Sequence, residues 1–247
     1  SALSIVGGTI TFSPSTYTYT VSVPYTTTST KITDTTTNGS ASFTLNGVAG
    51  VSGTASADIL LAAGAVTAET VTVTAQNGTD TKNYFINIKR LTASLGLSTI
   101  SVDSATVAAD GATFTTIRVT LKDSTGTQLT TSGGTLTFST PSLGLISAIT
   151  DNGDGTYTAK FTGGTVLGTT TITALINGSA ITSSTPSVQL VAGAASKIVL
   201  VTTAAGATAG AAFTTQPTLQ LQDSQNHVVT GSGVGITVSL GSGTFSG

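Results

Sequence analysis

Residues 17–23 read Tyr-Thr-Tyr-Thr-Val-Ser-Val, so aromatic or apolar residues alternate with hydroxyl-bearing ones throughout. Successive side chains of a β-strand point to opposite faces, and the stretch therefore predicts a strand with one buried face. The same alternation recurs at residues 71–75 and 84–88. Asn77-Gly78 between them predicts a hairpin whose two central residues have positive φ. These features predict a β-sandwich at residues 1–90.

Residues 91–193 repeat this pattern. Turn residues separate the alternating stretches, among them the acidic run 151–155, and no helical period lies between them. Short strands at such spacing predict a second β-sandwich. The expected apolar rows are Ile117, Val119 and Leu121; Leu136 and Phe138; Tyr157, Ala159 and Phe161; and Ile172, Ala174 and Ile176.

Residues 194–247 copy the first half of the second segment. The run 121–124 recurs at 221–224, and the run 130–139 recurs at 230–239, which indicates an internal repeat of about 100 residues. The equivalent of residues 148–193 does not follow, so we expect an incomplete third sandwich with exposed sheet edges. Either the sequence is a segment of a longer protein, or strands from another chain complete the unit.

The composition favours an all-β protein. Threonine is the commonest of the 247 residues, charged residues make up 7%, and cysteine is absent. Threonine and valine branch at Cβ, which suits strands and disfavours helices. The fold class we predict is therefore all-β, with tandem immunoglobulin-like β-sandwiches of which the last is incomplete. The linkers at 90–93 and 192–195 are short, which predicts a semi-rigid rod.

Charge and hydropathy exclude several classes of partner. The net charge is −2, so the surface lacks the excess of lysine and arginine that nucleic-acid binding requires. No apolar run approaches the roughly 20 residues that span a bilayer. The chain begins at Ser1 without a signal peptide, and we expect a mature chain or a fragment.

Two resemblances follow from these residues. Phe12-Ser13-Pro14 with the strand at 17–23, and the closing pair of stretches at 71–79 and 84–90, resemble the cadherin-like β-sandwich repeats of bacterial surface proteins. Residues 119–123 and 151–157 resemble the immunoglobulin-like repeats of invasin and intimin adhesins, and 194–247 resembles the first half of such a repeat. The resemblance implies an extracellular, cell-surface location and says little about activity.

The run Asp151-Asn152-Gly153-Asp154-Gly155 is the stretch most suggestive of a ligand site. Asp151 and Asp154 could supply oxygen ligands to calcium, which takes six to eight of them. Aspartate and asparagine also close tight turns by accepting backbone N–H groups, and Tyr157 stands where its hydroxyl could hold the loop. We expect a structural turn, with calcium as the open alternative and no other cofactor.

The remaining polar residues predict no catalytic site. A calcium ion at a domain junction could use Asp103, Asp110 or Asp123, although Asp123 and its repeat Asp223 are expected to close turns. The lone His227 has no second histidine or cysteine with which to share a metal. With a single glutamate, Glu69, no paired-carboxylate site is expected, and we predict that the chain is not an enzyme.

These features predict a structural repeat region of an extracellular cell-surface protein that forms a filament, sheath or S-layer-like lattice. Self-association with neighbouring copies is the expected partnership. One alternative is the stalk of a bacterial adhesin, whose contacts with host protein or surface glycan lie in domains not present here. Another is a set of accessory domains of a secreted enzyme.

Overall fold

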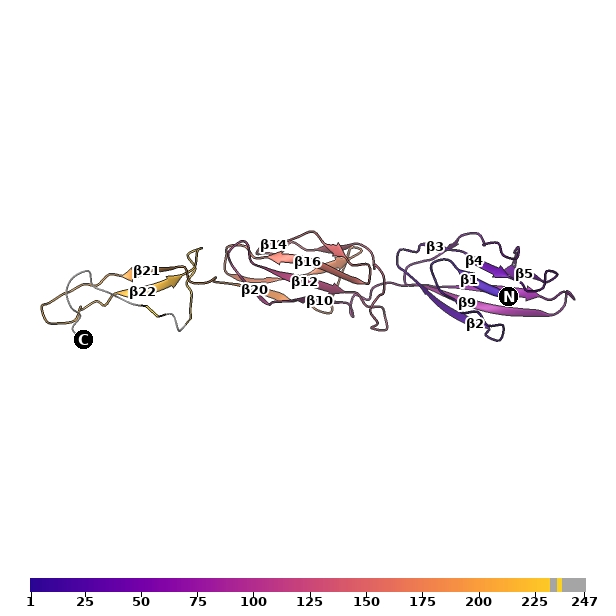
Figure 1. The fold of residues 1–247 in the computed structure, drawn as a ribbon, viewed down its shortest axis with the longest axis horizontal. Helices are drawn as coiled ribbons and strands as arrows, with labels where there is room; N and C mark the ends of the chain where they lie inside the picture. Colours follow the sequence, from indigo (N-terminus) through magenta and orange to yellow (C-terminus); the bar gives the residue numbers. More distant parts are fainter. Residues whose placement is uncertain (232–234, 237–247) are drawn as a thin grey trace.

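The computed structural model describes residues 1–231 together with Gly235 and Ile236. Within these residues the chain forms β-strands joined by turns, and the predicted all-β fold class is confirmed. Figure 1 shows two sandwiches and a slender hairpin unit placed end to end along one axis. The array is therefore a rod, with the first sandwich at one end and the hairpin unit at the other.

The first sandwich has a main sheet with strand order β2-β9-β8-β5-β6, and two small sheets, β1-β4 and β3-β7, lie against it. β2 runs parallel to β9, whereas β8 pairs antiparallel with both β9 and β5. The strands are β1 (Ala2–Ile5), β2 (Thr18–Val23), β3 (Ser29–Thr30), β4 (Ile32–Thr35), β5 (Ser42–Leu45), β6 (Val48–Ala49), β7 (Ile59–Leu60), β8 (Val66–Thr74) and β9 (Thr81–Arg90).

Alternation produces the first core. Within β2, Tyr19, Val21 and Val23 are buried and the intervening residues are exposed, as the period of two predicts. Ile86 and Ile88 of the neighbouring β9 are fully buried on the same face. These side chains meet those of β1 and β4 in one hydrophobic cluster between the sheets.

The second sandwich contains a sheet of order β10-β12-β16-β14, with β15 also paired to β16, and two three-stranded sheets, β11-β20-β17 and β13-β18-β19. Tyr157 and Phe161 from β16 are among its largest fully buried side chains. The strands are β10 (Thr99–Val102), β11 (Thr106–Ala108), β12 (Phe114–Thr120), β13 (Leu136–Phe138), β14 (Leu145–Ile146), β15 (Thr150–Asp151), β16 (Thr156–Thr162), β17 (Gly168–Thr171), β18 (Ala174–Ile176), β19 (Ser179–Ala180) and β20 (Ser187–Val191).

The described part of the third unit is a hairpin of β21 (Lys197–Thr202) and β22 (Thr218–Gln222), followed by a turn. The turn after β22 repeats hydrogen bonds of the second sandwich: Leu129 donates its N–H to Leu121 O, and Val229 donates its N–H to Leu221 O, both at 2.9 Å. The predicted repeat is thus present at 221–229. The predicted copy at 230–239 falls partly on residues 232–234 and 237–239, which lie outside the described residues.

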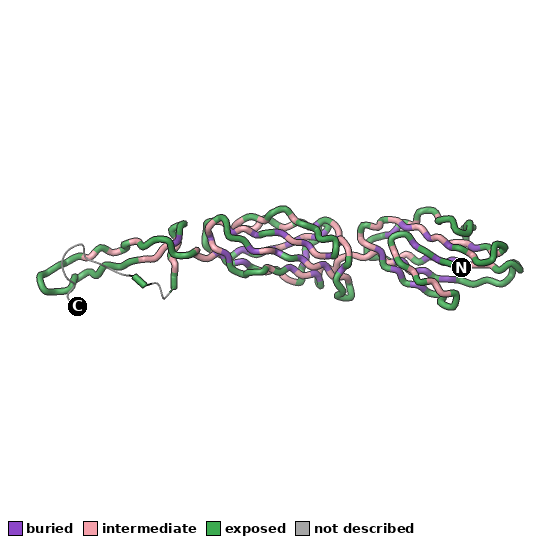
Figure 2. Tube along the Cα trace, in the orientation of Figure 1, coloured by how far each residue is buried: buried purple, intermediate pink, exposed green. Residues whose placement is uncertain are grey.

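Burial differs between the units. Figure 2 shows buried residues throughout the two sandwiches, whereas the described part of the hairpin unit is largely exposed. Ile198 and Leu200 of β21 are about half exposed, at 50% and 52%. The two sandwiches therefore contain the hydrophobic cores of the described chain.

Two local predictions need correction. Tyr17 precedes β2 and is about half exposed, and its ring stacks on that of the core residue Tyr84 from the outside. Asn77-Gly78 lies in a longer loop in which Gly78 alone of the pair has positive φ. The Asn77 side chain accepts the N–H groups of Thr79 and Asp80, and this lengthens the connection. Both residues have positive φ instead at Asn46-Gly47 and Asn177-Gly178.

Replacing Phe161 with alanine should test the second core. Its side chain is fully buried, and loss of a buried phenylalanine lowers the free energy of unfolding by about 3–5 kcal/mol. The matched control is Phe114→Ala in the paired strand β12, because Phe114 is 49% exposed. Thermal and urea unfolding should show a large loss for Phe161→Ala and a small one for Phe114→Ala; equal losses would contradict the assigned core.

Candidate functional site

The acidic turn at 151–155 uses its carboxylates internally. Asp151 accepts the N–H of Gly153 through Oδ1 at 2.9 Å and the hydroxyl of Ser132 through Oδ2 at 2.6 Å. Asp154 accepts both the N–H and the hydroxyl of Thr156 through Oδ1, and these bonds lower the pKa of Asp154. The two aspartates thus act as turn acceptors.

Tyr157 holds this region to the neighbouring loop. Its hydroxyl donates to Gly134 O at 2.7 Å and accepts the N–H of Gly133 at 3.1 Å. Burial raises the pKa of the Tyr157 hydroxyl, so the group stays protonated as the bond to Gly134 requires. A structural turn accounts for the bonds made here, and calcium at Asp151 and Asp154 stays a hypothesis.

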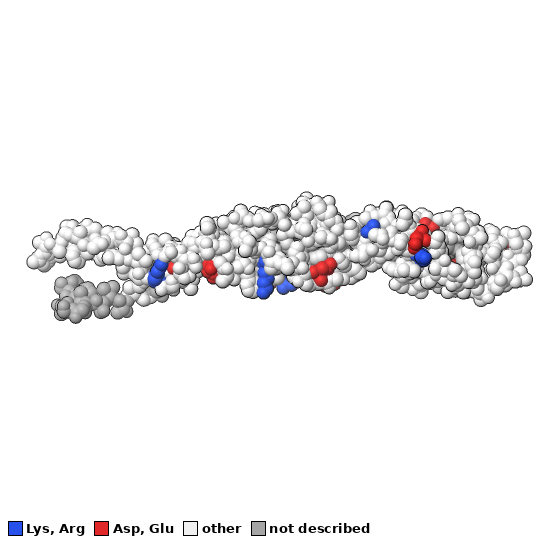
Figure 3. Space-filling model, turned by 90° about the horizontal axis from the view of Figure 1, so that it is seen from above, with Lys and Arg blue, Asp and Glu red and all other residues white. Residues whose placement is uncertain are grey.

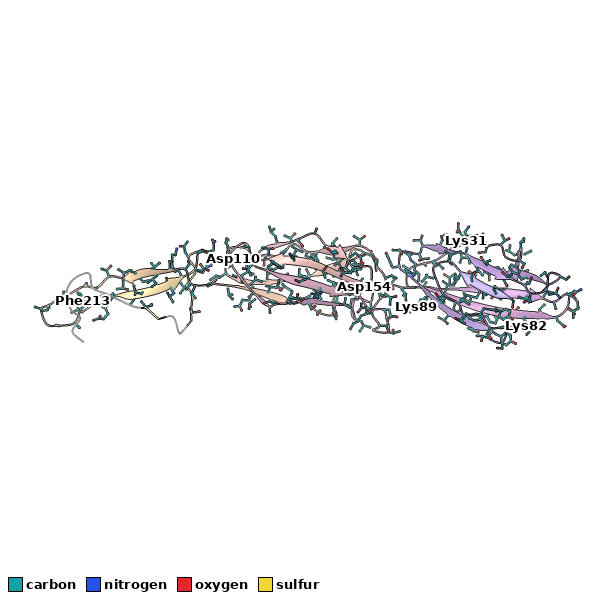
Figure 4. The ribbon with its side chains drawn as sticks, in the orientation of Figure 1. Lys31, Lys82, Lys89, Asp110, Asp154 and Phe213 are labelled. Atoms are coloured by element: carbon teal, nitrogen blue, oxygen red, sulfur yellow. The ribbon has the colours of Figure 1, made fainter. Side chains whose placement is uncertain are left out.

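The three aspartates considered for a junction calcium site are not brought together. Asp103 forms an ion pair with Arg118 on the strand beside it, with an N–O distance of 3.1 Å. Asp110 accepts the N–H groups of Ala112 and Thr113 in its own turn. Figure 4 places Asp110 at the end of the second sandwich farthest from Asp154. The described residues contain no group of three metal-ligating side chains.

The first junction is held by backbone and side-chain contacts from both sides. Leu91 donates its N–H to Val23 O in the first sandwich, and its side chain packs against the second core. Arg90 donates to Tyr25 O at 2.6 Å and lies over the Tyr25 ring, 4.7 Å from its centroid. The linker is therefore part of both sandwiches, which restricts bending between them.

Lys89 adds a charged contact at this junction. Its ammonium group lies 3.4 Å from the hydroxyl of Ser124. Asp123 accepts the hydroxyl and N–H of Thr125, and these bonds, with a smaller effect of Lys89, lower the pKa of its carboxyl group. Figure 4 shows Lys89 and Asp154 at the facing ends of the two sandwiches. An ammonium group here opposes a metal cation.

The second junction uses the repeat equivalent of Asp123. Asp223 is 2% exposed, and Oδ1 accepts the N–H groups of Gln225 and His227, as Asp123 does in its turn. Its second oxygen, Oδ2, accepts the N–H of Gly193 in the linker at 2.8 Å. The imidazole Nδ1 of His227 lies 3.0 Å from the same oxygen. Asp223 thus joins its turn to the linker.

These bonds fix the charge of Asp223. Burial raises the pKa, but the N–H donors of Gly193, His227 and Gln225 outweigh it and lower the pKa from 3.8 to about 2. The pKa is lower in the folded state, so the bonds stabilise the junction fully above pH 3.8, and the effect is lost as pH falls through about 2. The position of the His227 side chain is explained by its contact with Asp223 Oδ2.

The sequence analysis missed a pocket in the first sandwich. Glu69 is 7% exposed and accepts a hydrogen bond from the Asn46 amide at 2.5 Å. Burial raises the pKa of Glu69, against the effect of Asn46, which lowers it. This carboxyl lines a pocket of about 570 Å³. The sequence did contain a signal for this site, because Glu69 lies on the same face of an alternating strand as the apolar Val71.

Two family models match the first two segments of the sequence. Residues 1–91 match a family model described as cadherin-like beta sandwich domain, and residues 94–193 match one described as invasin, domain 3. Both resemblances drawn from the sequence are thereby confirmed. These families are named for sandwich and adhesin domains rather than for enzymes. No curated protein matches the chain significantly.

One solved structure shows the same fold, and others are more distantly similar. A structure of invasin, described as a bacterial integrin-binding protein, is 21% identical over 93% of this chain and 48% of its own, with a TM-score of 0.53. The chain thus spans about half of that structure, and the match shows a shared fold. Also similar are FdeC, an Escherichia coli adhesin (22% identity, 80% and 69% covered, TM-score 0.46), and domains 4 and 5 of the S-layer protein SbsC (24%, 65% and 82%, 0.40).

Calcium should leave the stability of the chain unchanged. Both carboxylate oxygens of Asp151 and Oδ1 of Asp154 already accept hydrogen bonds, and a cation bound to these oxygens would have to compete with those bonds. Melting temperatures measured with calcium and with a chelator are expected to coincide. A rise with calcium that Asp154→Asn abolishes would instead establish the calcium interpretation.

Asp223→Asn should loosen the second junction. The asparagine oxygen can still accept bonds from the turn, but an amide NH₂ cannot accept the N–H of Gly193. The chain lacks cysteine, so spin labels at Ser101→Cys and Thr203→Cys can report the distance distribution between the units. We expect broadening in Asp223→Asn and in the parent below about pH 2.

The control is Asp123→Asn, which changes the equivalent turn at the other junction. It should leave the distribution between these two labels unchanged. An unchanged distribution in Asp223→Asn would show that the bond to Gly193 does not hold the units in place.

Proposed function

We propose that the chain is a structural repeat region of an extracellular cell-surface protein that forms a filament, sheath or S-layer-like lattice. In this role it acts as a stiff spacer that sets the distance between the parts on either side of it. The observation that carries the proposal is the end-to-end array, in which both junctions are hydrogen-bonded through the linkers.

The junction chemistry supports a spacer. Ser94 donates its N–H to Lys122 O, and Ser196 donates to Gln222 O at the equivalent place in the third unit. Each linker is thus fixed to the turn of the unit that follows it. A flexible Gly/Ser tether would lack such bonds and would behave as a random coil.

The surface supports assembly with other copies. Figure 3 shows few charged side chains on the visible face, separated by long uncharged stretches. With 7% charged residues and a net charge of −2, long-range repulsion between copies is weak. The matches to adhesin and S-layer structures support an extracellular structural or adhesive role, and the lattice is the finer part of the proposal.

An adhesin stalk is the second candidate. It is favoured by the invasin match, which extends over 93% of this chain and therefore through both junctions. A stalk needs the same stiffness but no lateral association between copies. In that case the binding activity belongs to domains beyond this segment. Within the described residues no helix is long and apolar enough to cross a membrane.

Electron microscopy of the full-length protein distinguishes the two candidates. We expect ordered fibres or sheets with a repeat distance at least as long as the rod formed by this segment. The length of the rod is measured separately by small-angle scattering. Dispersed rods at all concentrations and salt conditions would contradict the lattice. Rods that bind a surface ligand through a distal domain would establish the stalk instead.

A further inference from the structure

The first sandwich is open along one side. The pocket that contains Glu69 lies between the inner face of β8 and the opposite small sheet, with the loop 50–58 along its wall. Its floor is formed by Phe43, Val71 and Ile32 of the core. Because the pocket reaches the surface, it is a groove into which another group can be placed.

Along this groove, no strand of the described chain pairs with the edge of β8 that faces away from β9. Thr70 accepts the N–H of Asn46 and donates its own N–H to Asn46 Oδ1, so both of its backbone groups point away from β9. Alternate residues of a strand point the same way, and Ala68 and Val66 therefore also turn their N–H and C=O groups away from β9. Among the described residues, the pairing of β5 with β8 ends at Leu45 and Val71.

The rim of the groove is apolar and exposed. Val48, Val51 and Leu60 line it and are 72%, 69% and 79% exposed. Clustered apolar side chains beside an unpaired strand edge mark a surface that binds another segment.

The groove also has a charge preference. Its lining includes the carboxyl groups of Glu69 and Asp58, and it includes no lysine or arginine. Asp58 lies at the exposed rim, 3.8 Å from Lys31, whereas Glu69 is buried with the Asn46 amide as its hydrogen-bond donor. A cation that enters beside Glu69 would therefore meet an acid that no basic side chain neutralises.

We propose that this groove binds an extended polypeptide strand that pairs with the free edge of β8 and carries a lysine or arginine directed at Glu69. The backbone of the bound strand would donate hydrogen bonds to the C=O groups of Ala68 and Val66 and accept hydrogen bonds from their N–H groups. Its inward side chains would cover Thr67 and Glu69, which face the groove from the same strand. The proposal does not depend on the role of the rod as a spacer.

The geometry selects a strand over a compact ligand. The two free residues, Val66 and Ala68, provide the backbone groups of one extended segment, at about 3.3 Å per residue. Apolar side chains at alternate positions of such a segment would contact Val48, Val51 and Leu60 on the rim. A small aliphatic amine would satisfy Glu69 but would leave the edge of β8 unpaired.

The probe is an acetylated peptide with the sequence of residues 196–203, Ser-Lys-Ile-Val-Leu-Val-Thr-Thr, which places a lysine and two valines on one face. Its binding to the full chain is measured by fluorescence anisotropy, with norleucine in place of lysine as the matched peptide. We expect norleucine to weaken binding about tenfold, since hydrogen bonds to charged groups contribute at that level. Glu69→Gln should weaken the lysine peptide similarly and leave the norleucine peptide unchanged.

The edge is tested by Ala68→Pro against Ala68→Val. Proline removes an N–H that the ladder with β9 does not use, so the sandwich should still fold while binding is lost; valine keeps the N–H and should retain binding. Amide exchange of Ala68 and Val66 should slow when the peptide binds. If Ala68→Pro fails to fold, the amide-exchange measurement and the Glu69→Gln variant still test whether a strand binds at this edge.

Several results would overturn the proposal. They are the absence of peptide binding, binding that neither Glu69→Gln nor Ala68→Pro weakens, and unchanged exchange at Ala68 and Val66. Displacement of the peptide by n-octylamine, with amine binding unaffected by Ala68→Pro, would assign the groove to a small amphiphilic amine. The rod length measured by scattering stays the same in each case, so the outcome is separate from that of the spacer.

Discussion

A carboxylate that accepts backbone N–H groups is the interaction on which much of this structure depends. Asp110, Asp123, Asp154 and Asp223 each close a turn in this way. Charge-assisted bonds of this kind are stronger than neutral ones, and they order a turn without a large core. In a chain with 7% charged residues, these four carboxylates thus organise the backbone of the turns in which they stand. The connections they fix hold neighbouring strands in register.

Turns of this type also explain how one repeat can be joined to the next. Asp123 and Asp223 use one oxygen for the same local bonds, while the surroundings of the second oxygen differ between the junctions. At the first junction Lys89 lies near this turn, and at the second the linker N–H of Gly193 binds Oδ2. The first contact is exposed and screened by salt, whereas the second is buried. The first junction is thus sensitive to salt and the second to strong acid, although the two turns are equivalent.

The alternation of residues predicted the core well, because a period of two assigns each side chain to a face before the partner strands are known. Val21, Ile86, Val119 and Phe161 are all buried as their positions indicate. Prediction failed where side chains change the local path, as at Asn77, whose amide extends the loop. It also failed for Glu69, because the alternating pattern assigns a residue to the inner face but does not show that the sandwich is open there. The bond from Asp223 to Gly193 spans 30 residues and has no local signal.

The open side of the first sandwich contrasts with the way sheet edges are usually protected. Exposed edges are commonly blocked by lysine, proline or a covering loop, since unpaired backbone groups attract other strands. The edge at Val66–Ala68 contains neither lysine nor proline, and the side chains on the nearby rim of the groove are valine and leucine. The low content of charged residues in the chain accounts for the absence of lysine at this edge. It does not account for a buried carboxyl group beside the edge, since burial without a neighbouring cation disfavours the charged form of Glu69. A partner that supplies a positive charge would offset the cost of burying this acid, and this connects the edge, the apolar rim and Glu69 in one surface.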